Sequence, residues 1–163
     1  MRPMRFLPAA FLLLGVSLLA QGGGPPAAAY MSAAEINNGL SRAVAADAAA
    51  GAAVTISPGI AVRRRSGAGE PQYAIIHPFS TEIYYVIEGT GSLVTGGTLV
   101  LPLAPSTDPD VVRSKAIKDG ATRTIGKGDV IVVPPGTPHW FKAIDGTITY
   151  LESRVRVKGQ PEP

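Results

Sequence analysis

The spacing of apolar residues along the chain changes at Gly51. Before this glycine, Ile36, Leu40 and Val44 recur at every fourth position, which is the spacing of one face of an α-helix. The pattern predicts an amphipathic helix within residues 30–51. We expect its apolar stripe to pack against a sheet or a partner subunit.

Both ends of the predicted helix carry recognisable signals. Ser32 and Glu35 have the spacing of a capping box, in which each side chain bonds to the other residue's backbone amide. Gly51 is a typical residue to end a helix, because glycine readily adopts the left-handed conformation required there.

After residue 51, apolar and polar residues alternate with the period of two that is typical of β-strands. Glycine and proline interrupt the alternation at short intervals, and the chain holds 19 Gly and 15 Pro, so many turns are expected. Many short strands between turns favour a β-sandwich or barrel. We predict an all-β body over residues 52–157. Its predicted strands are 53–57, 60–65, 71–77, 82–88, 91–95, 97–101, 121–125, 129–134, 138–144 and 147–156.

Two segments depart from this alternation. Residues 102–121 are polar and irregular, and we predict a long loop there. Residues 158–163 form a short polar tail with two prolines, which we expect to be disordered.

Length and composition limit the chemistry. The 163 residues suit one domain with a core of its own. The absence of cysteine excludes disulfides, thiolate metal sites and a cysteine nucleophile. Only two histidines are present, His77 and His139, so any imidazole chemistry must use them.

The N-terminus has the three-part pattern of a secretory signal peptide. Residues 1–5 are basic, residues 6–20 are mostly apolar, and small residues follow. The apolar run includes Pro8 and is too short to span a bilayer well. We therefore predict that residues 1–29 are a signal peptide and tether, that the protein is exported to the periplasm or secreted, and that no stable membrane insertion remains after cleavage.

Export also changes the charge balance. The formal net charge of +3 falls to +1 once Arg2 and Arg5 are removed. Residues 63–65 are all arginine, but successive residues of a strand point to opposite faces, which favours a solvated strand edge over a binding site for an anionic partner. We expect no nucleic-acid partner.

The two histidines stand in stretches with distinctive spacing. The first, HPFSTEIYYVIEG at residues 77–89, places Glu82 after His77 with four residues between them, and Gly89 after Glu82 with six. The second, GDVIVVPPGTPH, covers residues 128–139. Its marked positions are Gly128, Pro134, Gly136 and His139.

These stretches resemble, in order and internal spacing, the two motifs of the cupins, small β-barrels of the jelly-roll type. Two positions depart from the family pattern: Ile75 stands where the first motif has an additional histidine, and Ala143 replaces an asparagine of the second. The resemblance implies a double-stranded β-helix, or jelly-roll barrel, which the helix predicted from apolar spacing would precede. It also implies a homodimer.

The resemblance further implies a metal site at His77, Glu82 and His139. Two imidazoles and one carboxylate suit a divalent transition metal, with Fe, Mn, Ni, Cu and Zn as candidates. The family usually supplies three histidines and one glutamate. Ile75 removes one imidazole, which either weakens metal binding and leaves an open coordination position, or marks a site that has lost its metal.

Strand alternation leads to a similar site independently. Residues two apart in a strand share a face. Three strands would then each present one ligand-type residue beside apolar or aromatic neighbours, which is how a dry pocket with a few polar groups is built. The three predicted faces are Tyr73, Ile75 and His77; Glu82, Tyr84 and Val86; and His139 and Phe141. The candidates for the lining of a substrate pocket are Tyr73, Ile75, Tyr84 and Phe141, although barrel packing is the alternative role for the aromatic side chains.

Two functions from different classes follow. The first is a metal-dependent enzyme that oxygenates, isomerises or decarboxylates a small organic substrate, with catalytic residues that the sequence does not identify. The second is a non-catalytic barrel that binds a small molecule or a metal through a degenerate site. Ile75 favours the second function, and the three retained ligand types favour the first.

Overall fold

A computed structural model describes residues 26–46, 51–68 and 72–157. Most of the predicted signal peptide and the predicted tail at 158–163 lie outside the described residues. Within the described residues, no helix is long and apolar enough to span a membrane.

The predicted N-terminal helix is present as α1, Ala33–Ala46. Its capping box is formed: the Ser32 backbone amide donates to Glu35 Oε2 at 2.8 Å, and the Glu35 amide donates to Ser32 Oγ at 3.3 Å. Leu40 is fully buried and Ile36 packs beside it, as the apolar stripe predicts. The side chain of Val44 lies outside the described residues.

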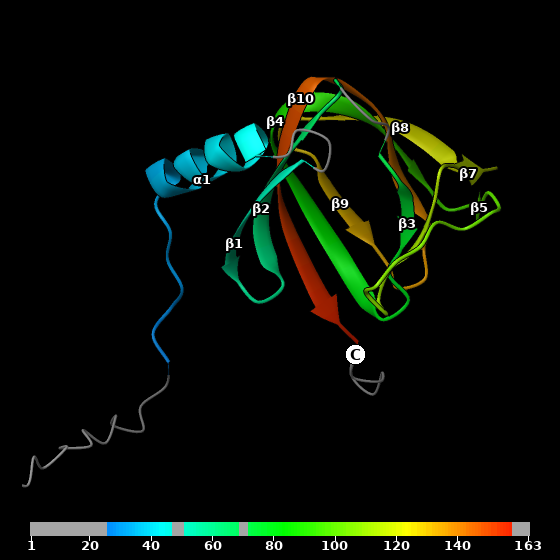
Figure 1. The fold of residues 1–163 in the computed structure, drawn as a ribbon, viewed down its shortest axis with the longest axis horizontal. Helices are drawn as coiled ribbons and strands as arrows, with labels where there is room; N and C mark the ends of the chain where they lie inside the picture. Colours follow the sequence, from blue (N-terminus) through cyan, green and yellow to red (C-terminus); the bar gives the residue numbers. More distant parts are fainter. Residues whose placement is uncertain (1–25, 47–50, 69–71, 158–163) are drawn as a thin grey trace, which may run out of the picture.

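The rest of the chain forms a barrel-like β body (Figure 1). One sheet has the strand order β1-β2-β10-β3-β6, and β4 adds to it by pairing with β10, β8 and β9, all antiparallel. A separate two-stranded sheet pairs β5 with β7. The strands are β1 (Ala52–Ser57), β2 (Ile60–Ser66), β3 (Ala74–Ile76), β4 (Ser80–Thr95), β5 (Thr98–Leu99), β6 (Val112–Ser114), β7 (Ile117–Lys118), β8 (Ala121–Gly126), β9 (Val130–Val133) and β10 (His139–Arg156).

The two long strands β4 and β10 pair along nearly their whole lengths. Each of them joins two predicted strands, so the turns expected at Gly89 and Gly146 are bends within a strand and not strand ends. Gly89 has φ of +82°, and a Cβ there would lie 2.0 Å from the Thr147 carbonyl oxygen. Only glycine fits this crossing of the two strands, which lets both strands continue around the barrel.

The prediction of a long loop over residues 102–121 is wrong for part of that segment. It contains β6, which pairs with β3, and β7, which pairs with β5. These short strands are held by backbone hydrogen bonds to distant partners, which local polarity does not reveal. The same segment supplies Asp110, whose buried side chain and backbone contribute to the site described below.

The strand predicted over 71–77 is shorter in the structure, where β3 covers Ala74–Ile76. The expected shared face of Tyr73 and His77 is wrong, because Tyr73 is 46% exposed while His77 is only 2% exposed. The chain leaves the strand at His77, where Pro78 follows and the His77 carbonyl accepts a hydrogen bond from the Gly136 amide at 2.9 Å. The other two predicted faces are confirmed: all their members are buried.

Two apolar clusters stabilise this arrangement. The larger fills the barrel interior with Tyr84, Val86, Leu93, Ile125, Val133, Phe141, Ile148 and Tyr150. The smaller one joins α1 to the outside of β1 and β2 through Leu40, Ala52 and Val62. The helix thus covers strands at one end of the sheet (Figure 1).

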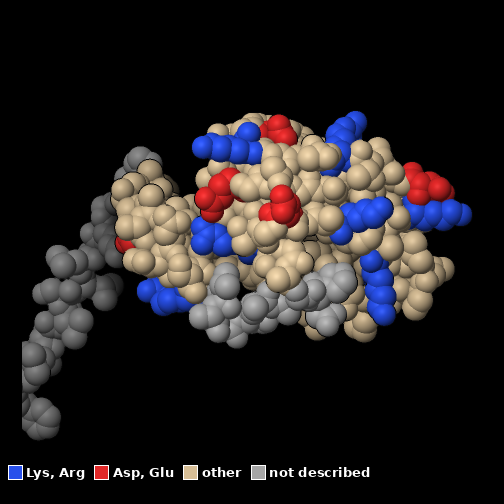
Figure 2. All heavy atoms as spheres, turned by 90° about the horizontal axis from the view of Figure 1, so that it is seen from above, with Lys and Arg blue, Asp and Glu red and all other residues tan. Residues whose placement is uncertain are grey.

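Charged side chains are mixed on the surface. Figure 2 shows lysine and arginine interspersed with aspartate and glutamate on the face seen from above, with no large area of one sign. This distribution fits the small net charge calculated after removal of the predicted signal peptide.

We expect Leu40→Ala to destabilise the protein by about 2–4 kcal/mol, because it removes a fully buried side chain between α1 and the sheet. Chemical denaturation monitored by circular dichroism measures the change. Asn37→Ala, on the exposed side of the same helix, is the matched control and should change stability by less than about 0.5 kcal/mol. Equal effects of both substitutions would contradict the packing of α1.

Candidate metal centre

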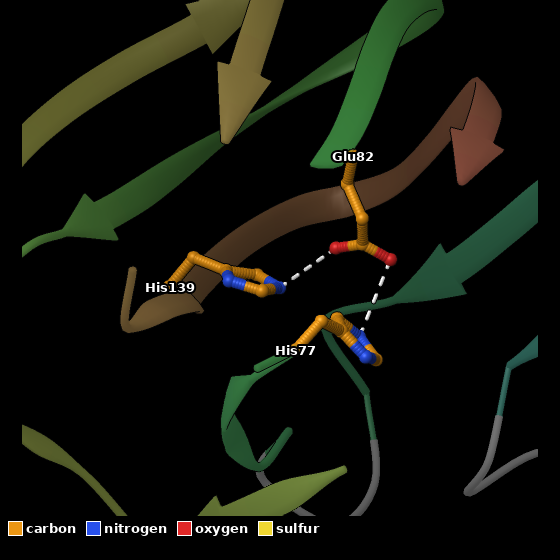
Figure 3. Close-up of side chains that lie close together, drawn as sticks. All are labelled: His77, Glu82 and His139. Atoms are coloured by element: carbon orange, nitrogen blue, oxygen red, sulfur yellow. Dashed lines mark ion pairs between the residues drawn. The ribbon is translucent and has the colours of Figure 1, made fainter. Parts of the chain in front are cut away.

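His77, Glu82 and His139 point toward one another inside one end of the barrel (Figure 3). Glu82 stands near the start of β4, His139 is the first residue of β10, and His77 follows β3 directly. All three side chains are at most 2% exposed. Each offers one ligand atom, and these atoms lie within 4.8 Å of one another.

Backbone pairing brings the three residues together. In the antiparallel ladders His139 lies opposite Ile75 on β3 and opposite Thr95 on β4. The turn before β10 is tied to the end of β3 by the hydrogen bond from the Gly136 amide to the His77 carbonyl. Because Gly136 has φ of +75°, the tight turn that positions His139 suits a glycine at this position.

The position of Ile75 matters for the ligand count. Ile75 lies directly opposite His139 in the β3–β10 pair, at the edge of the cluster, and is partly buried. The structure therefore places an apolar residue opposite His139 in the backbone pairing, at the position where the cupin motif has its additional histidine.

Each imidazole is oriented by its Nδ1 atom. His77 Nδ1 donates to the Asp110 backbone carbonyl at 2.5 Å, and His139 Nδ1 donates to the Thr137 carbonyl at 3.0 Å. With the proton on Nδ1, each Nε2 atom carries the lone pair, and both Nε2 atoms lie near Glu82. Backbone carbonyls that hold the second nitrogen in this way are typical of metal-ligating histidines.

The Glu82 carboxylate contacts both imidazoles, one with each of its oxygens. His139 Nε2 lies 2.9 Å from Oε2, and His77 Nε2 lies 3.3 Å from Oε1. Burial alone would raise the pKa of Glu82, but the contacts with His139, His77 and the Tyr84 hydroxyl outweigh it and hold this pKa far below its ordinary value. Burial lowers the pKa of His77, against the opposing effect of Glu82, which favours the neutral, ligating imidazole.

The hydrogen bonding on the His139 side is incomplete. His139 Nε2 is buried and has no hydrogen-bond partner among the described residues, although Glu82 Oε2 lies only 2.9 Å away. With Nδ1 protonated, both atoms are acceptors and neither supplies a proton. A buried arrangement of this kind requires a proton or a cation between the two atoms. The residues present therefore fit a metal ion.

Arg154 is a neighbour that sequence reasoning missed. Its Nε donates to Glu82 Oε1 at 3.0 Å, and its Nη2 lies 2.9 Å from the same oxygen and 3.1 Å from His77 Nε2. Arg154 lies opposite Glu82 in the β4–β10 ladder. A signal was available: Tyr150, Glu152 and Arg154 alternate along one predicted strand and therefore share one face.

The four predicted pocket residues take different places. Tyr84 donates from its hydroxyl to Glu82 Oε2 at 2.5 Å, and its buried ring packs against Phe141 and Tyr150. Burial, reinforced by the Glu82 carboxylate, raises the pKa of Tyr84 well above its ordinary value, so its hydroxyl keeps its proton and donates. Phe141 fills the interior, Ile75 borders His139, and Tyr73 lies outside the cluster with the Arg113 guanidinium 5.0 Å from its ring centre.

A cavity of about 420 Å³ lies on the Arg154 side of the cluster. Ligand sites for small molecules commonly have a volume of about 300–1,000 Å³. On the opposite side, the aromatic rings of the large apolar cluster fill the barrel interior. The cavity is lined by Pro58, Gly59, Ser80, Asp108, Asp110, Arg154 and Arg156.

The chain belongs to the cupin family. Residues 31–151, most of the chain, match the family described as Cupin. This match confirms the resemblance of the two motifs, and the β body with helix α1 confirms the expected fold class.

Comparisons with individual proteins give weaker matches. No curated protein matches the chain. Solved structures that match include the DMSP lyase DddQ from Ruegeria pomeroyi DSS-3, with 20% identity over 65% of this chain and 42% of that chain and a TM-score of 0.39. Another is CoII HppE in complex with Tris buffer, with 14% identity over 66% and 54% and a TM-score of 0.45. Recombinant oxalate oxidase in complex with glycolate has 23% identity over 63% and 44% and a TM-score of 0.36. The chain spans about half the length of these structures.

Proposed function

We propose that this cupin binds a divalent transition metal through His77, Glu82 and His139. The observation that carries the proposal is the buried contact of His139 Nε2 with Glu82 Oε2 at 2.9 Å, in which His139 Nε2 has no hydrogen-bond partner among the described residues. A metal ion between imidazole and carboxylate ligands would satisfy both atoms.

The surrounding residues would hold the ligands in place. The carbonyls of Asp110 and Thr137 fix the two imidazole rings, and the Tyr84 hydroxyl fixes one carboxylate oxygen of Glu82. With three protein ligands, coordination positions remain for water or substrate. The metal would supply Lewis acidity or activate oxygen or water.

The substrate class we propose is a small organic molecule that enters from the cavity on the Arg154 side. Its volume of about 420 Å³ and the charged residues in its lining, Asp108, Asp110, Arg154 and Arg156, suit a compact polar substrate. Oxygenation, isomerisation and decarboxylation are all compatible with a three-ligand site of this type. Tyr84 and Arg154 are proton-bearing groups that donate hydrogen bonds to Glu82.

Two observations favour a second candidate, a non-catalytic barrel that binds a ligand or a metal weakly. Ile75 provides no imidazole at the position opposite His139. Arg154 already contacts His77 and Glu82 with its own positive charge. In this second function the cluster would be mainly structural.

Metal analysis of the purified mature protein tests the metal site. We expect close to stoichiometric divalent metal in the wild type. His139→Ala should lower the metal affinity by about 10–100-fold or more, because loss of a residue that only supports a ligand already lowers metal affinity by that factor. Lys142→Ala, at an exposed position of β10, is the control and should retain the metal. A metal-free wild type that takes up no divalent ion would overturn the proposal.

Export and dimerisation remain predictions. For a homodimer, we propose the outer face where β4 pairs with β9 as the contact, since Ile83 lies opposite Val132 and Tyr85 opposite Val130, and all four side chains are exposed. Within the described residues β9 pairs on one side only, so a second copy could also extend the sheet there.

A further inference from the structure

The guanidinium of Arg154 lies between the proposed metal ligands on the His77 side of the cluster. It reaches the cluster from β10 and is 26% exposed, so it forms the border between the buried ligands and the cavity. Two of its three nitrogens, Nε and Nη2, contact Glu82 Oε1, and Nη2 also contacts His77 Nε2.

The atoms that Arg154 contacts are the ones a metal needs. His77 carries its proton on Nδ1, so the lone pair on Nε2 is the only one available for coordination. That lone pair accepts from Arg154 at 3.1 Å, whereas the corresponding lone pair of His139 has no partner among the described residues. The cluster is therefore asymmetric: its His139 half is open to a cation, and its His77 half is taken by a cation of the chain itself.

We propose that Arg154 is a built-in competitor of the metal, and that metal binding requires its guanidinium to leave His77 and Glu82. The inference rests on the proposed function of metal binding by the same three residues. Arg154 would set the metal affinity of the site without serving as a ligand.

Electrostatics support this competition. Burial opposes the charged form of Arg154, but Glu82 and Glu152 outweigh it and raise the pKa of Arg154, so the guanidinium stays positive at all ordinary pH values. A divalent ion at the cluster would lie within a few ångströms of this charge. Both the lost charge-assisted hydrogen bonds and the repulsion would therefore weaken metal binding as long as Arg154 points inward.

The structure offers a place for the displaced side chain. The adjacent cavity contains Asp108 and Asp110, and Glu152 Oε1 already lies 3.7 Å from Arg154 Nη2. The Asp110 carboxylate is bonded to the Phe79 amide and the Ser80 hydroxyl, at 2.8 and 2.6 Å. Asp108 is exposed at the cavity wall. Its Oδ1 accepts from the Asp110 amide at 2.8 Å, and Glu152 Oε2 pairs with Arg63 at 2.7 Å, so the other carboxylate oxygen of each residue is the one that could receive the guanidinium.

Zinc titration of the metal-free protein tests the competition. Arg154→Gln should bind Zn²⁺ about tenfold or more tightly than the wild type by isothermal titration calorimetry, since it removes the competing charge and its hydrogen bonds. Arg154→Lys keeps the positive charge but loses the planar guanidinium that bonds two atoms at once. Its Zn²⁺ affinity should lie between those of the wild type and Arg154→Gln. Arg64→Gln removes an equal charge from an ion pair with Glu88 on another part of the barrel, and should leave the affinity unchanged.

A second measurement follows Arg154 itself. In the metal-free wild type, the Nε–H of Arg154 should give a distinct, slowly exchanging ¹⁵N NMR signal because it is bonded to a buried carboxylate. Zn²⁺ should abolish or strongly shift this signal. This readout needs no variant, so it remains available if Arg154→Gln does not fold.

The outcomes separate the inference from the function on which it rests. A wild type that binds Zn²⁺ with an unchanged Arg154 signal, or an Arg154→Gln variant with unchanged affinity, overturns the inference and leaves the metal site intact. Binding by Arg154→Gln alone supports the inference and overturns metal binding by the wild type. If neither protein binds Zn²⁺ or another divalent transition metal, both proposals fail.

Discussion

Glu82→Gln is expected to lower stability by about 2–4 kcal/mol and to weaken metal binding by more than about 100-fold. The carboxylate is 1% exposed and carries the contacts of Arg154, Tyr84 and His139. The substitution keeps the shape but leaves Arg154 without its counter-charge. Loss of one partner from a fully buried pair costs about 3–5 kcal/mol, and the lower range reflects the 26% exposure of Arg154.

The pH dependence of this effect has a defined sign. The pKa of Glu82 in the folded protein lies far below its ordinary value of 4.5, so the unfolded chain binds the proton more readily. The stability that the carboxylate provides is therefore full above pH 4.5 and is lost as the pH falls toward the folded-state pKa. The stability difference between wild type and Glu82→Gln should narrow over this acidic range.

Urea denaturation at several pH values measures the loss of stability in Glu82→Gln and its decrease at acidic pH. The matched control is Glu88→Gln on the same strand, where the carboxylate is 55% exposed and pairs with Arg64 at the surface. Its effect should stay within about 1 kcal/mol. The double variant Glu82→Gln with Arg154→Gln should be more stable than the sum of the single effects predicts, because the unpaired charge is gone. A Glu82→Gln protein as stable as the control would contradict the buried ion pair.

The convergence of His77, Glu82 and His139 was predicted from the resemblance to the two cupin motifs, whereas local features of the sequence account for the burial of Glu82 and His139. Strand alternation places Glu82, Tyr84 and Val86 on one inward face, and the tight turn ending at His139 starts a strand whose first side chain is buried. These features depend on residues close together in the chain. Spacing within two short stretches was therefore sufficient to predict them.

The contacts that sequence reasoning missed depend on strand pairing across long separations. Arg154 meets Glu82 across 72 positions of the chain, and Asp110 meets His77 across 33. Which residue lies opposite which depends on the register of β4 against β10 and on the path of residues 102–121. Neither can be obtained from local spacing, since a shift of one residue would move Arg154 to the other face.

Tyr73 illustrates the opposite limitation. Alternation alone placed it on the same face as His77, but the alternation assumes an unbroken strand over 71–77. The strand ends at Ile76, so the period of two no longer relates these residues. The aromatic ring instead lies against Arg113, which stands opposite Ile75 on β6, a strand in the segment predicted to be a loop.

Ile75→His is expected to tighten divalent metal binding by about 10–100-fold, the largest gain we foresee from a single substitution. Ile75 lies directly opposite His139 in the β3–β10 pair and at the edge of the cluster. An imidazole there would add a third nitrogen ligand beside the two present, in a pocket whose backbone is already formed. The added ligand would also offset part of the competition from Arg154.

Calorimetric titration with Zn²⁺ of wild type and variant measures the gain. Ile76→His is the matched control, because its side chain points to the other side of the same strand and should not reach the cluster. Combining Ile75→His with His139→Ala should remove most of the gain, since the new imidazole can act only beside the existing ligands. Unchanged affinity in a folded Ile75→His protein would show that position 75 is not a ligand position, and would thus contradict the alignment of the first motif with Ile75 in the place of a histidine.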